Sequence, residues 1–390
     1  MSRIDDLIEE LCPSGVPYRA LGDVGEFIRG NGLQKKDLLE EGVPAIHYGQ
    51  IHTHYGVWTT ETQSFTSPEI AVKLRRARPG DLLIATTSED DEAVAKATAW
   101  LGKSEVVLSG DAYIYRHELD PRYVSYFFQT EQFQVQKRRH ISGAKVRRIA
   151  GASLAKIRIP VPPLEVQREI VQILDKFMEL EAELEAELEA RRRQYEYYRS
   201  TLMSSKDAEQ SAMISLADIF EMRAGTHISA ANISDKPTDE KPYPCFGGNG
   251  LRGFVSSFNY NEPVILIGRQ GALCGNVHRA EGRVYATEHA VVVTPKTEVD
   301  MSWAFHKLTE MQLNQYKTES AQPGLAVGRV KKIMLNRVPL DVQRSVGIAL
   351  DNFDALVNDL SSGLPAEIAA RRKQYEYYRD QLLTFKELSA

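Results

Sequence analysis

The 390-residue sequence has few cysteines and no long apolar run. Only Cys12, Cys245 and Cys274 are present, without metal-type spacing, and no uninterrupted apolar stretch approaches twenty residues. A membrane-spanning helix needs about twenty such residues, and residues 1–6 do not resemble a secretion leader. Isolated cysteines suit a reducing compartment. We therefore expect a cytoplasmic protein without a membrane partner.

Motifs for catalysis are also lacking. Gly102-Lys103-Ser104 resembles the end of a P-loop, but residue 97 is alanine where that motif needs glycine. The glycines of residues 247–250 lack dinucleotide-binding spacing, and no Asn/Asp-Pro-Pro-aromatic run typical of amino-methyltransferases is present. A nuclease or methyltransferase would need a metal or cofactor motif. The sequence therefore predicts a chain that is not an enzyme and that holds no cofactor.

Two clusters could in principle hold a metal. His47, His52 and His54 lack a carboxylate or cysteine complement, so a surface or base-contacting strand is favoured over a zinc site. The acidic run of residues 88–92 is interpreted as a solvated loop and not as a magnesium site. No metal site is predicted.

The net charge of −5 is unevenly distributed. Residues 161–206 contain 7 basic and 10 acidic side chains and residues 338–390 contain 6 and 8, whereas residues 1–160 and 207–337 are each balanced. Residues 132–158 contain eight basic side chains and no acidic one, around a small-residue turn at 142–144. A second loop with basic residues follows at 321–332. Such clusters indicate phosphate binding, although a solvated face remains open on charge alone.

A long internal repeat organises the chain. Residues 190–199, ARRRQYEYYR, return as ARRKQYEYYR at 370–379, and PLEVQR at 163–168 returns as PLDVQR at 339–344. A fainter match joins Leu21–Glu26 with Gly30 to Leu216–Glu221 with Gly225. The order is domain, helix, domain, helix, so the molecule is built twice.

The helical segments have a narrow apolar stripe. Leu164 to about Leu202 contains no glycine or proline, with Leu188, Tyr195 and Leu202 seven residues apart, and Ile368, Tyr375 and Leu382 match them in the second copy. Such a stripe suits one partner helix. An antiparallel pair within the chain is favoured, with pairing to a second molecule left open. The second segment is predicted to break at residues 361–365.

The first helix carries the tetrapeptide repeat Leu-Glu-Ala-Glu from residue 180. Each unit adds about 6 Å of helix, which exceeds the roughly 3.4 Å rise of one base pair.

The chain resembles the specificity subunit of type I restriction–modification systems. The resemblance rests on the two Pro-Leu-acid-Val-Gln-Arg segments, the two RR(R/K)QYEYYR blocks and the opening residues 11–17 with 21–24. It implies two target recognition domains, each binding half of a split double-stranded DNA target. It also implies two modification subunits that use S-adenosylmethionine, and restriction subunits that use ATP and Mg²⁺. All of these cofactors would belong to the partners.

We therefore expect an α+β protein with an internal repeat, in which two α/β recognition domains are separated by two long helices forming an antiparallel coiled coil. Its predicted segments are residues 1–160, 161–206, 207–337 and 338–390. Residues 81–85, 112–115, 263–267 and 290–293 are expected as buried strands, and 121–136 and 299–316 as helices. A coiled-coil scaffold, or a DNA-binding protein without a restriction role, is the alternative function.

Loops on a rigid scaffold are where base contacts are expected. Basic and amide side chains can read guanine and adenine edges, and other basic residues can contact phosphate. The predicted base readers are Gln34, Lys35, Lys36 and Thr87 in the first domain and Asn249, Arg252, Arg269 and Gln270 in the second. The predicted phosphate contacts are Lys137, Arg138, Arg139, Lys145, Arg147, Arg148, Arg329 and Lys331.

The repeated tyrosine blocks predict a docking surface as well as a core. Tyr195 and Tyr375, at heptad spacing, are assigned to the helix pair. Tyrosine and arginine are favoured interface anchors. The side chains predicted to dock two identical modification subunits are Arg192, Tyr197, Tyr198, Arg372, Tyr377 and Tyr378.

Overall fold

The computed structural model describes residues 3–204, 213–271, 273–318 and 323–388. Its contacts divide the chain into two compact units, one comprising Met1–Glu183 with Ile368–Ala390 and the other Leu184–Glu367. Both boundaries fall inside helices, so each unit combines one recognition region with parts of both helical segments. The bounds of the four predicted segments stay predictions, and the one between residues 206 and 207 lies outside the described residues.

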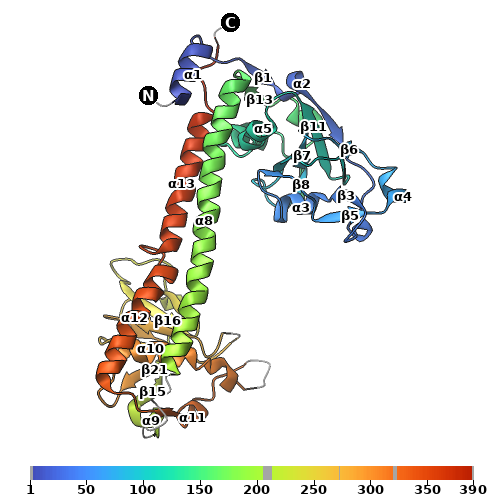
Figure 1. Ribbon diagram of the computed structural model, residues 1–390. Helices are drawn as coiled ribbons and strands as arrows, with labels where there is room; N and C mark the ends of the chain where they lie inside the picture. The colour runs from blue at the N-terminus through green and yellow to red at the C-terminus, as the bar shows by residue number, and fades with distance from the viewer. Residues whose placement is uncertain (1–2, 205–212, 272, 319–322, 389–390) are drawn as a thin grey trace. The chain divides into compact units, whose positions relative to one another are not determined.

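The first unit is a mixed α/β structure (Figure 1). Its strands are β1 (Tyr18–Ala20), β2 (Gly25–Arg29), β3 (Val43–Ile46), β4 (Trp58–Thr59), β5 (Ser64–Thr66), β6 (Arg76–Ala77), β7 (Leu82–Ala85), β8 (Thr87–Ser88), β9 (Ala97–Trp100), β10 (Val106–Leu108), β11 (Ala112–His117), β12 (Arg147–Arg148) and β13 (Arg158–Pro160). Its helices are α1 (Arg3–Leu11), α2 (Leu21–Val24), η1 (Lys35–Asp37), α3 (Tyr48–Thr53), α4 (Pro68–Ala71), α5 (Pro121–Phe127), α6 (Glu131–Arg138) and α7 (Gly151–Leu154), with parts of α8 (Leu164–Met203) and α13 (Leu364–Leu382).

The second unit contains the remaining elements. Its strands are β14 (Met213–Ser215), β15 (Phe220–Ala224), β16 (Tyr243–Gly247), β17 (Gly250–Val255), β18 (Val264–Gly268), β19 (Val277–Ala280), β20 (Tyr285–Ala286), β21 (Ala290–Pro295) and β22 (Met334–Asn336). Its helices are α9 (Leu216–Ile219), η3 (Ala230–Asn232), α10 (Met301–Glu310), η4 (Leu313–Tyr316), α11 (Val327–Val330) and α12 (Leu340–Asn358), with the rest of α8 and the start of α13.

The two units repeat one sheet topology, which confirms the predicted internal repeat. The order β2-β11-β7-β9 in the first unit corresponds to β15-β21-β18-β19 in the second. In each unit a further sheet contains one parallel pair, β10 with β3 and β20 with β16. The short antiparallel pairs β1-β13 and β14-β22 also correspond. Both units are therefore built on the same backbone plan with different side chains.

Buried apolar strands form the centre of each recognition region. All four residues of β7 and all five of β18 are buried, as expected for strands covered on both faces. The strands predicted at residues 81–85, 112–115, 263–267 and 290–293 are confirmed. The two predicted helices are each divided in the structure. Thr130 caps α6, its Oγ1 accepting from Phe133 N, and Gln312 adopts a left-handed φ of 46° before η4.

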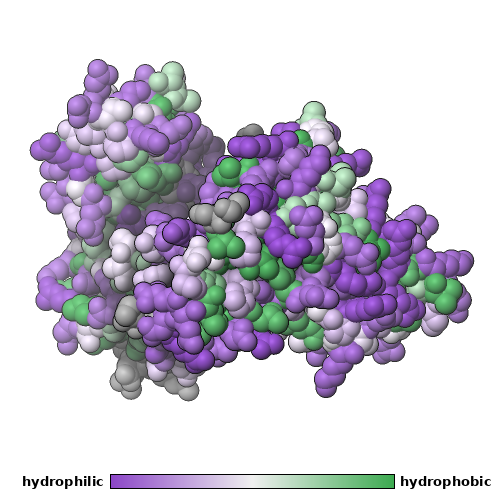
Figure 2. Space-filling model, turned by 90° about the horizontal axis from the view of Figure 1, so that it is seen from above, coloured by the Kyte–Doolittle hydropathy of each residue, from purple (hydrophilic) through white to green (hydrophobic). Residues whose placement is uncertain are grey.

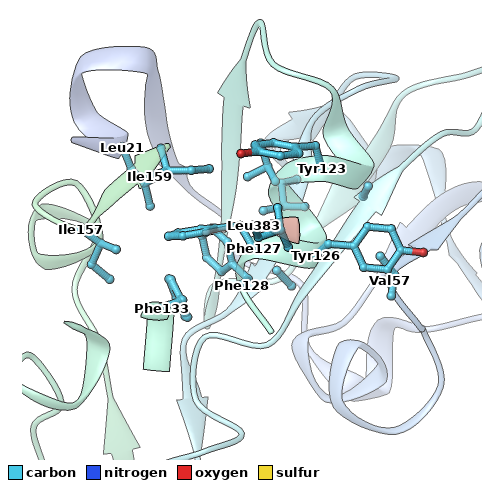
Figure 3. Close-up of a cluster of buried hydrophobic side chains, with 14 of the residues drawn as sticks. Leu21, Val57, Tyr123, Tyr126, Phe127, Phe128, Phe133, Ile157, Ile159 and Leu383 are labelled. Atoms are coloured by element: carbon cyan, nitrogen blue, oxygen red, sulfur yellow. The ribbon is translucent and has the colours of Figure 1, made fainter. Parts of the chain in front are cut away.

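An aromatic cluster fills the core of the first unit (Figure 3). Phe127 and Phe133 are fully buried, and Leu383, which follows α13, lies in the same cluster with no exposed surface. The segment beyond α13 then runs beside the start of the unit, where Val16 N donates to Lys386 O and Leu388 N donates to Val16 O. Residues far apart in the sequence are thereby joined in one core. The helix expected over residues 338–390 therefore ends at Leu382, and residues 383–388 are not helical.

The repeated Pro-Leu-acid-Val-Gln motif has the same role in both units. The Gln167 side chain donates to Pro162 O at 2.8 Å and accepts from Asp120 N at 2.9 Å. Gln343 makes the matching bonds to Val338 O and Asp300 N at 2.8 and 2.9 Å. Both glutamines are buried. Each one fixes the start of a long helix to the start of α5 or α10.

Each part of α8 packs against an antiparallel helix within its own unit. In the first unit, where α8 and α13 lie side by side, the rings of Phe177 and Tyr378 stack with centroids 5.6 Å apart, and Arg372 pairs with Glu181 at 2.6 Å. In the second, the rings of Tyr198 and Phe353 lie 5.5 Å apart. The predicted antiparallel pairing within the chain is therefore confirmed.

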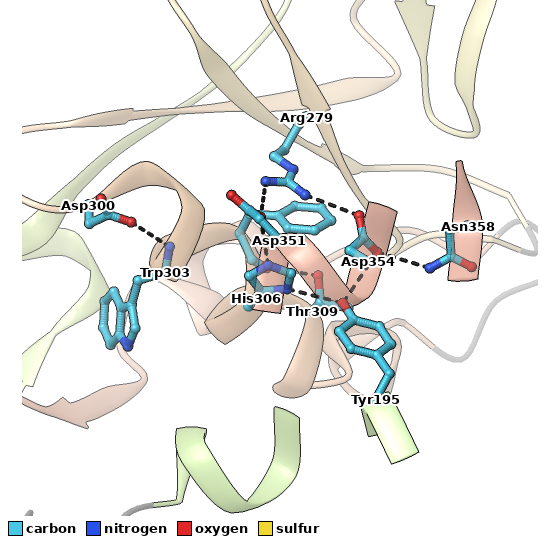
Figure 4. Close-up of polar contacts among 10 residues, drawn as sticks. Tyr195, Arg279, Asp300, Trp303, His306, Thr309, Asp351, Asp354 and Asn358 are labelled. Atoms are coloured by element: carbon cyan, nitrogen blue, oxygen red, sulfur yellow. Dashed lines mark hydrogen bonds and ion pairs between the residues drawn. The ribbon is translucent and has the colours of Figure 1, made fainter. Parts of the chain in front are cut away.

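A polar network anchors the second part of α8 (Figure 4). His306 is buried and lies 3.1 Å from Tyr195 Oη and 2.9 Å from Asp351 Oδ1. Burial lowers the pKa of His306 despite its neighbour Asp351, and it raises the pKa of Tyr195 to about 12. Tyr195 and Tyr375 are both buried, as predicted, but they also contact α10 and the α5 region through His306 and Gln129.

The predicted break in the second helical segment is confirmed between α12 and α13. The Ser361 and Ser362 hydroxyls and the Ser361 backbone N–H donate to the Asp359 carboxylate, and these bonds lower the pKa of Asp359 to about 2. A Cβ at Gly363 would lie 2.4 Å from the Ala355 carbonyl oxygen, so the turn requires glycine.

Hydrophilic residues cover most of the face seen in Figure 2, with apolar residues in small groups. Among the described residues, no helix is both long and apolar enough to span a membrane.

Candidate nucleic-acid interface

Each unit has a hollow near the ends of its central strands. The first hollow, of about 540 Å³, lies beside β2, β3 and the loop before β11, and its lining includes Arg29, Asn31, Gln34, His47 and Asp111. The second, of about 640 Å³, lies beside the β16–β17 turn and the loop before β21, and its lining includes Asn249, Arg252, Gln270 and His289. These hollows contain four of the predicted base readers.

Close backbone packing requires glycine at equivalent positions of the two units. A Cβ on Gly30 would lie 2.1 Å from the Ser109 carbonyl oxygen, and one on Gly225 would lie 2.3 Å from the Ala286 oxygen. No side chain fits at such distances. The sequence match between these two glycines therefore reflects a shared crossing of two chain segments.

The predicted readers of the first unit lie at two places. Gln34 caps the helical turn η1, and it and the two lysines of that turn, Lys35 and Lys36, are exposed. Thr87 lies on β8, half-buried, and its carbonyl oxygen is 3.0 Å from His52 Nε2.

The predicted phosphate contact Lys137 is wrong. Its side chain is fully buried, and its ammonium donates to the carbonyl oxygens of Glu92 and Val94 at 2.8 and 2.9 Å. Burial lowers the pKa of Lys137 to about 8. The basic pattern suggested a surface residue, but the apolar spacing of α6 places this position on its inner face. Lys137 fastens the acidic loop and does not face solvent.

Two of the other predicted phosphate contacts pair with acidic side chains. Arg138 pairs with Glu131 at 3.2 Å, and Arg147 pairs with Asp91 at 2.8 Å. Besides Arg138, the predicted phosphate contacts that are exposed within residues 137–148 are Arg139, Lys145 and Arg148. The positive charge available for phosphate is thus smaller than the count in the sequence suggested, and the acidic loop of residues 88–92 is exposed but held in place.

The small-residue turn between the basic clusters has a defined shape. Ser142 and Arg148 exchange two backbone hydrogen bonds of 2.9 Å, and Gly143 has a φ of +93°. A Cβ on Gly143 would lie 2.1 Å from the Val146 carbonyl oxygen. This turn is closed and requires glycine, so it presents Lys145 and Arg148 in a fixed arrangement.

The histidines do not converge on a metal. His47 Nδ1 accepts from Gly49 N at 3.2 Å and so caps α3, while His52 binds the Thr87 carbonyl. Burial is the main cause of the lowered pKa of both rings. No group of three or more metal-ligating side chains occurs within residues 3–204, 213–271, 273–318 and 323–388.

In the second unit, Asn249, Arg252 and Gln270 are exposed around the hollow, as their predicted role requires. Arg269 is half-buried, with Nη1 3.5 Å from the Glu288 carbonyl oxygen. Arg329 is exposed on α11, and Lys331 follows it, half-buried. Residues 321 and 322 of the predicted basic loop lie outside the described residues.

Thr87 and Gln270 occupy equivalent positions. Thr86 N donates to Asp111 O at 3.0 Å, and Arg269 N donates to His289 O at 2.8 Å. The residues that follow, Thr87 and Gln270, each pair with a distant segment. Thr87 pairs with Arg148, and Gln270 pairs with Gly324. Asp111 and His289 therefore also correspond. Sequence reasoning missed His289, although the offset of 178 between the flanking strands would have aligned it with Asp111.

The predicted docking residues differ in exposure. Tyr197 and Tyr377 are 67% and 61% exposed, whereas Tyr198 and Tyr378 lie against Phe353 and Phe177. Arg192 is exposed on α8, and Arg372 bonds Glu181 across the helix pair. Tyr197 and Tyr377 therefore form the clearest repeated surface feature.

Comparison with known proteins agrees with the repeat. The family model for the type I restriction modification DNA specificity domain matches residues 13–190 and 208–370. The specificity subunit of the type I restriction enzyme EcoprrI from Escherichia coli is 50% identical over 207 residues, which is 52% of each chain. The EcoR124I/EcoR124II specificity subunit of the same species is 31% identical over 292 residues, covering 68% of this chain and 70% of that one. The chain thus matches about half the length of the first relative.

Solved structures share the fold. The S subunit of a type I restriction–modification system from M. genitalium superposes with a TM-score of 0.59 at 16% identity, covering 95% of this chain and 96% of that one. A chain from a structure describing complex assembly of the type I system superposes with a TM-score of 0.66 at 14% identity, covering 96% and 98%.

Proposed function

We propose that this chain, which belongs to the type I restriction–modification DNA specificity family, reads a bipartite double-stranded DNA target, with one recognition region for each half-site. The family confers DNA sequence specificity within restriction–modification systems. The observation that supports a bipartite target is that equivalent positions carry different side chains, such as Thr87 against Gln270 and Asp111 against His289. One backbone plan with two sets of reading groups suits two different half-sites.

The chain would direct partner subunits and would not itself be catalytic. Two modification subunits would methylate adenine with S-adenosylmethionine, and restriction subunits would use ATP and Mg²⁺. The relatives named as specificity subunits support this division of labour.

The exposed repeat tyrosines are the proposed docking points for the two modification subunits. Tyr197 and Tyr377 present equivalent large surfaces, and Arg192 and Arg372 precede them by five residues in each block. Reversing the charge of Arg372 would also disturb its bond to Glu181, so Tyr197→Ala and Tyr377→Ala are the cleaner variants. Each single variant should weaken binding of one modification subunit. If the double variant still binds two modification subunits, these tyrosines are not the docking points.

Selection of bound duplexes from a random library tests the reading function. The chain, purified with the modification subunits encoded beside it, should enrich two short conserved blocks separated by a fixed gap of variable sequence. One continuous block would contradict the bipartite proposal. The scaffold alternative predicts no enrichment and no salt-dependent DNA retention, whereas phosphate contacts make retention fall steeply as salt rises.

A further inference from the structure

A chain of polar contacts in the second unit ends on Gln270. Glu288 Oε1 lies 2.8 Å from His227 Nδ1 and 3.3 Å from His289 Nε2. The other ring nitrogen of His289, Nδ1, lies 2.7 Å from Gln270 Oε1. Gln270 and His289 line the hollow, whereas the side chain of Glu288 is only 28% exposed. The carboxylate therefore supports the two residues of the hollow from behind.

The Glu288 carboxylate lies against the His289 ring. Partial burial tends to raise the pKa of Glu288, but the His227 hydrogen bond and the nearby His289 outweigh it, so the pKa is lowered. An ionised carboxylate is an acceptor only. It faces His289 Nε2 at 3.3 Å, on the side of the ring away from Gln270. The ring geometry is set from the carboxylate side.

The remaining bond determines which end of the Gln270 amide is presented. Because Gln270 Oε1 can only accept, His289 Nδ1, 2.7 Å away, is the donor of this bond. The amide oxygen is then engaged, and the amide NH₂ is the group left for a ligand. A neutral ring with its lone pair on Nδ1 would require the opposite amide orientation, presenting oxygen.

We infer that Gln270 is a specificity-determining residue of the second half-site, donating its amide NH₂ to guanine, and that His289 and Glu288 are positioning residues that fix this polarity. Guanine offers two adjacent acceptors, N7 and O6, in the major groove, whereas cytosine offers none. This inference rests on the proposed function.

The first unit provides a matched control because it lacks this relay. At the equivalent position Asp111 lies 3.8 Å from Arg29, and Thr87 replaces Gln270. Thr87→Ala alters the same backbone position in the other recognition region. It should leave the second half-site unchanged.

Duplex selection with three variants tests the relay. Gln270→Ala and His289→Ala should reduce guanine preference at one position of the second half-site by about tenfold, which corresponds to about 1.4 kcal/mol. Glu288→Gln has nearly the same shape without the charge. Because it removes the charge that faces the His289 ring, it should reduce the guanine preference at that same position. The first half-site should be unchanged in all three.

The outcome of these selections distinguishes a wrong positioning role from a wrong reading residue and from a wrong proposed function. If Gln270→Ala changes the position but the His289 and Glu288 variants do not, the positioning role is overturned. If no variant changes the motif, or if all three abolish the whole second half-site, Gln270 is not the reader inferred here. A wild-type chain that selects no two-block motif would instead defeat the proposed function.

Discussion

At the scale of single residues, Lys137 occupies an environment that normally excludes a charged amine. Two backbone carbonyls accept from its ammonium, and its position on α6 ties the acidic loop to the core. The loop begins next to Thr87, so this buried lysine supports one edge of the first reading surface.

The lowered pKa of Lys137 predicts a pH-dependent stability. Its folded pKa of about 8 lies below the ordinary value of 10.5. Between these values the unfolded chain binds more protons, so raising the pH favours the folded state. The free energy of unfolding of the wild type, minus that of Lys137→Met, should increase from pH 8 to pH 10. Urea unfolding at several pH values measures it, and a difference that does not change with pH would contradict the burial.

The paired glutamines predict equal costs in the two units. Gln167→Ala or Gln343→Ala removes two hydrogen bonds and leaves buried backbone groups unpaired, which should cost about 2 to 3 kcal/mol. The exposed Gln34, which caps only the short turn η1, provides a comparison for which Gln34→Ala should cost less, about 1 kcal/mol or below. Denaturant unfolding compares them. A loss below about 0.5 kcal/mol for both buried positions would show that these bonds are not important for stability.

At the scale of elements, α8 is one continuous helix shared by both units, since the unit boundary falls between Glu183 and Leu184. The tetrapeptide repeat lies at this boundary. Its residues are strong helix formers, and most of their side chains are exposed. The length of α8 can therefore change there with little loss of core packing.

Deleting Leu184–Glu187 should change the gap between half-sites and leave the half-sites themselves unchanged. The deletion shortens α8 by about 6 Å, which exceeds the roughly 3.4 Å rise of a base pair. Inserting a second copy of the same four residues should change the gap in the opposite direction. Duplex selection measures the gap and the half-sites for both variants. Altered half-sites with an unaltered gap would show that α8 does not set the spacing.

At the scale of the whole molecule, equivalent junctions should make the recognition regions interchangeable. The pairs β1-β13 and β14-β22 flank each region in the same way. Asp175 bonds Tyr126, and Asp351 bonds His306 at the matching position of the next helix. Replacing residues 216–333 with residues 21–157 should therefore yield a chain that selects the first half-site twice. Retention of the original second half-site would place its readers outside the exchanged region.

Much of this architecture follows from the sequence because repeats and apolar periodicity report directly on packing. The duplicated motifs predicted two units, and the glycine-free stretch predicted α8. The position of Lys137 did not follow, because residue type suggests exposure while the helix face determines burial. The relay through His289 also depends on strand pairing between distant segments. The structural equivalence of Thr87 and Gln270 emerges only from matched backbone hydrogen bonds. Local sequence does not encode these long-range contacts directly.

Methylome sequencing of single DNA molecules tests the central claim most directly. A host carrying this chain with its neighbouring modification gene is compared with the same host lacking the chain. The account predicts one new bipartite motif containing N6-methyladenine in the first host, which would define both half-sites and their gap. Assembly of the complex without any new methylated motif would contradict the claim that this chain reads DNA for a modification enzyme.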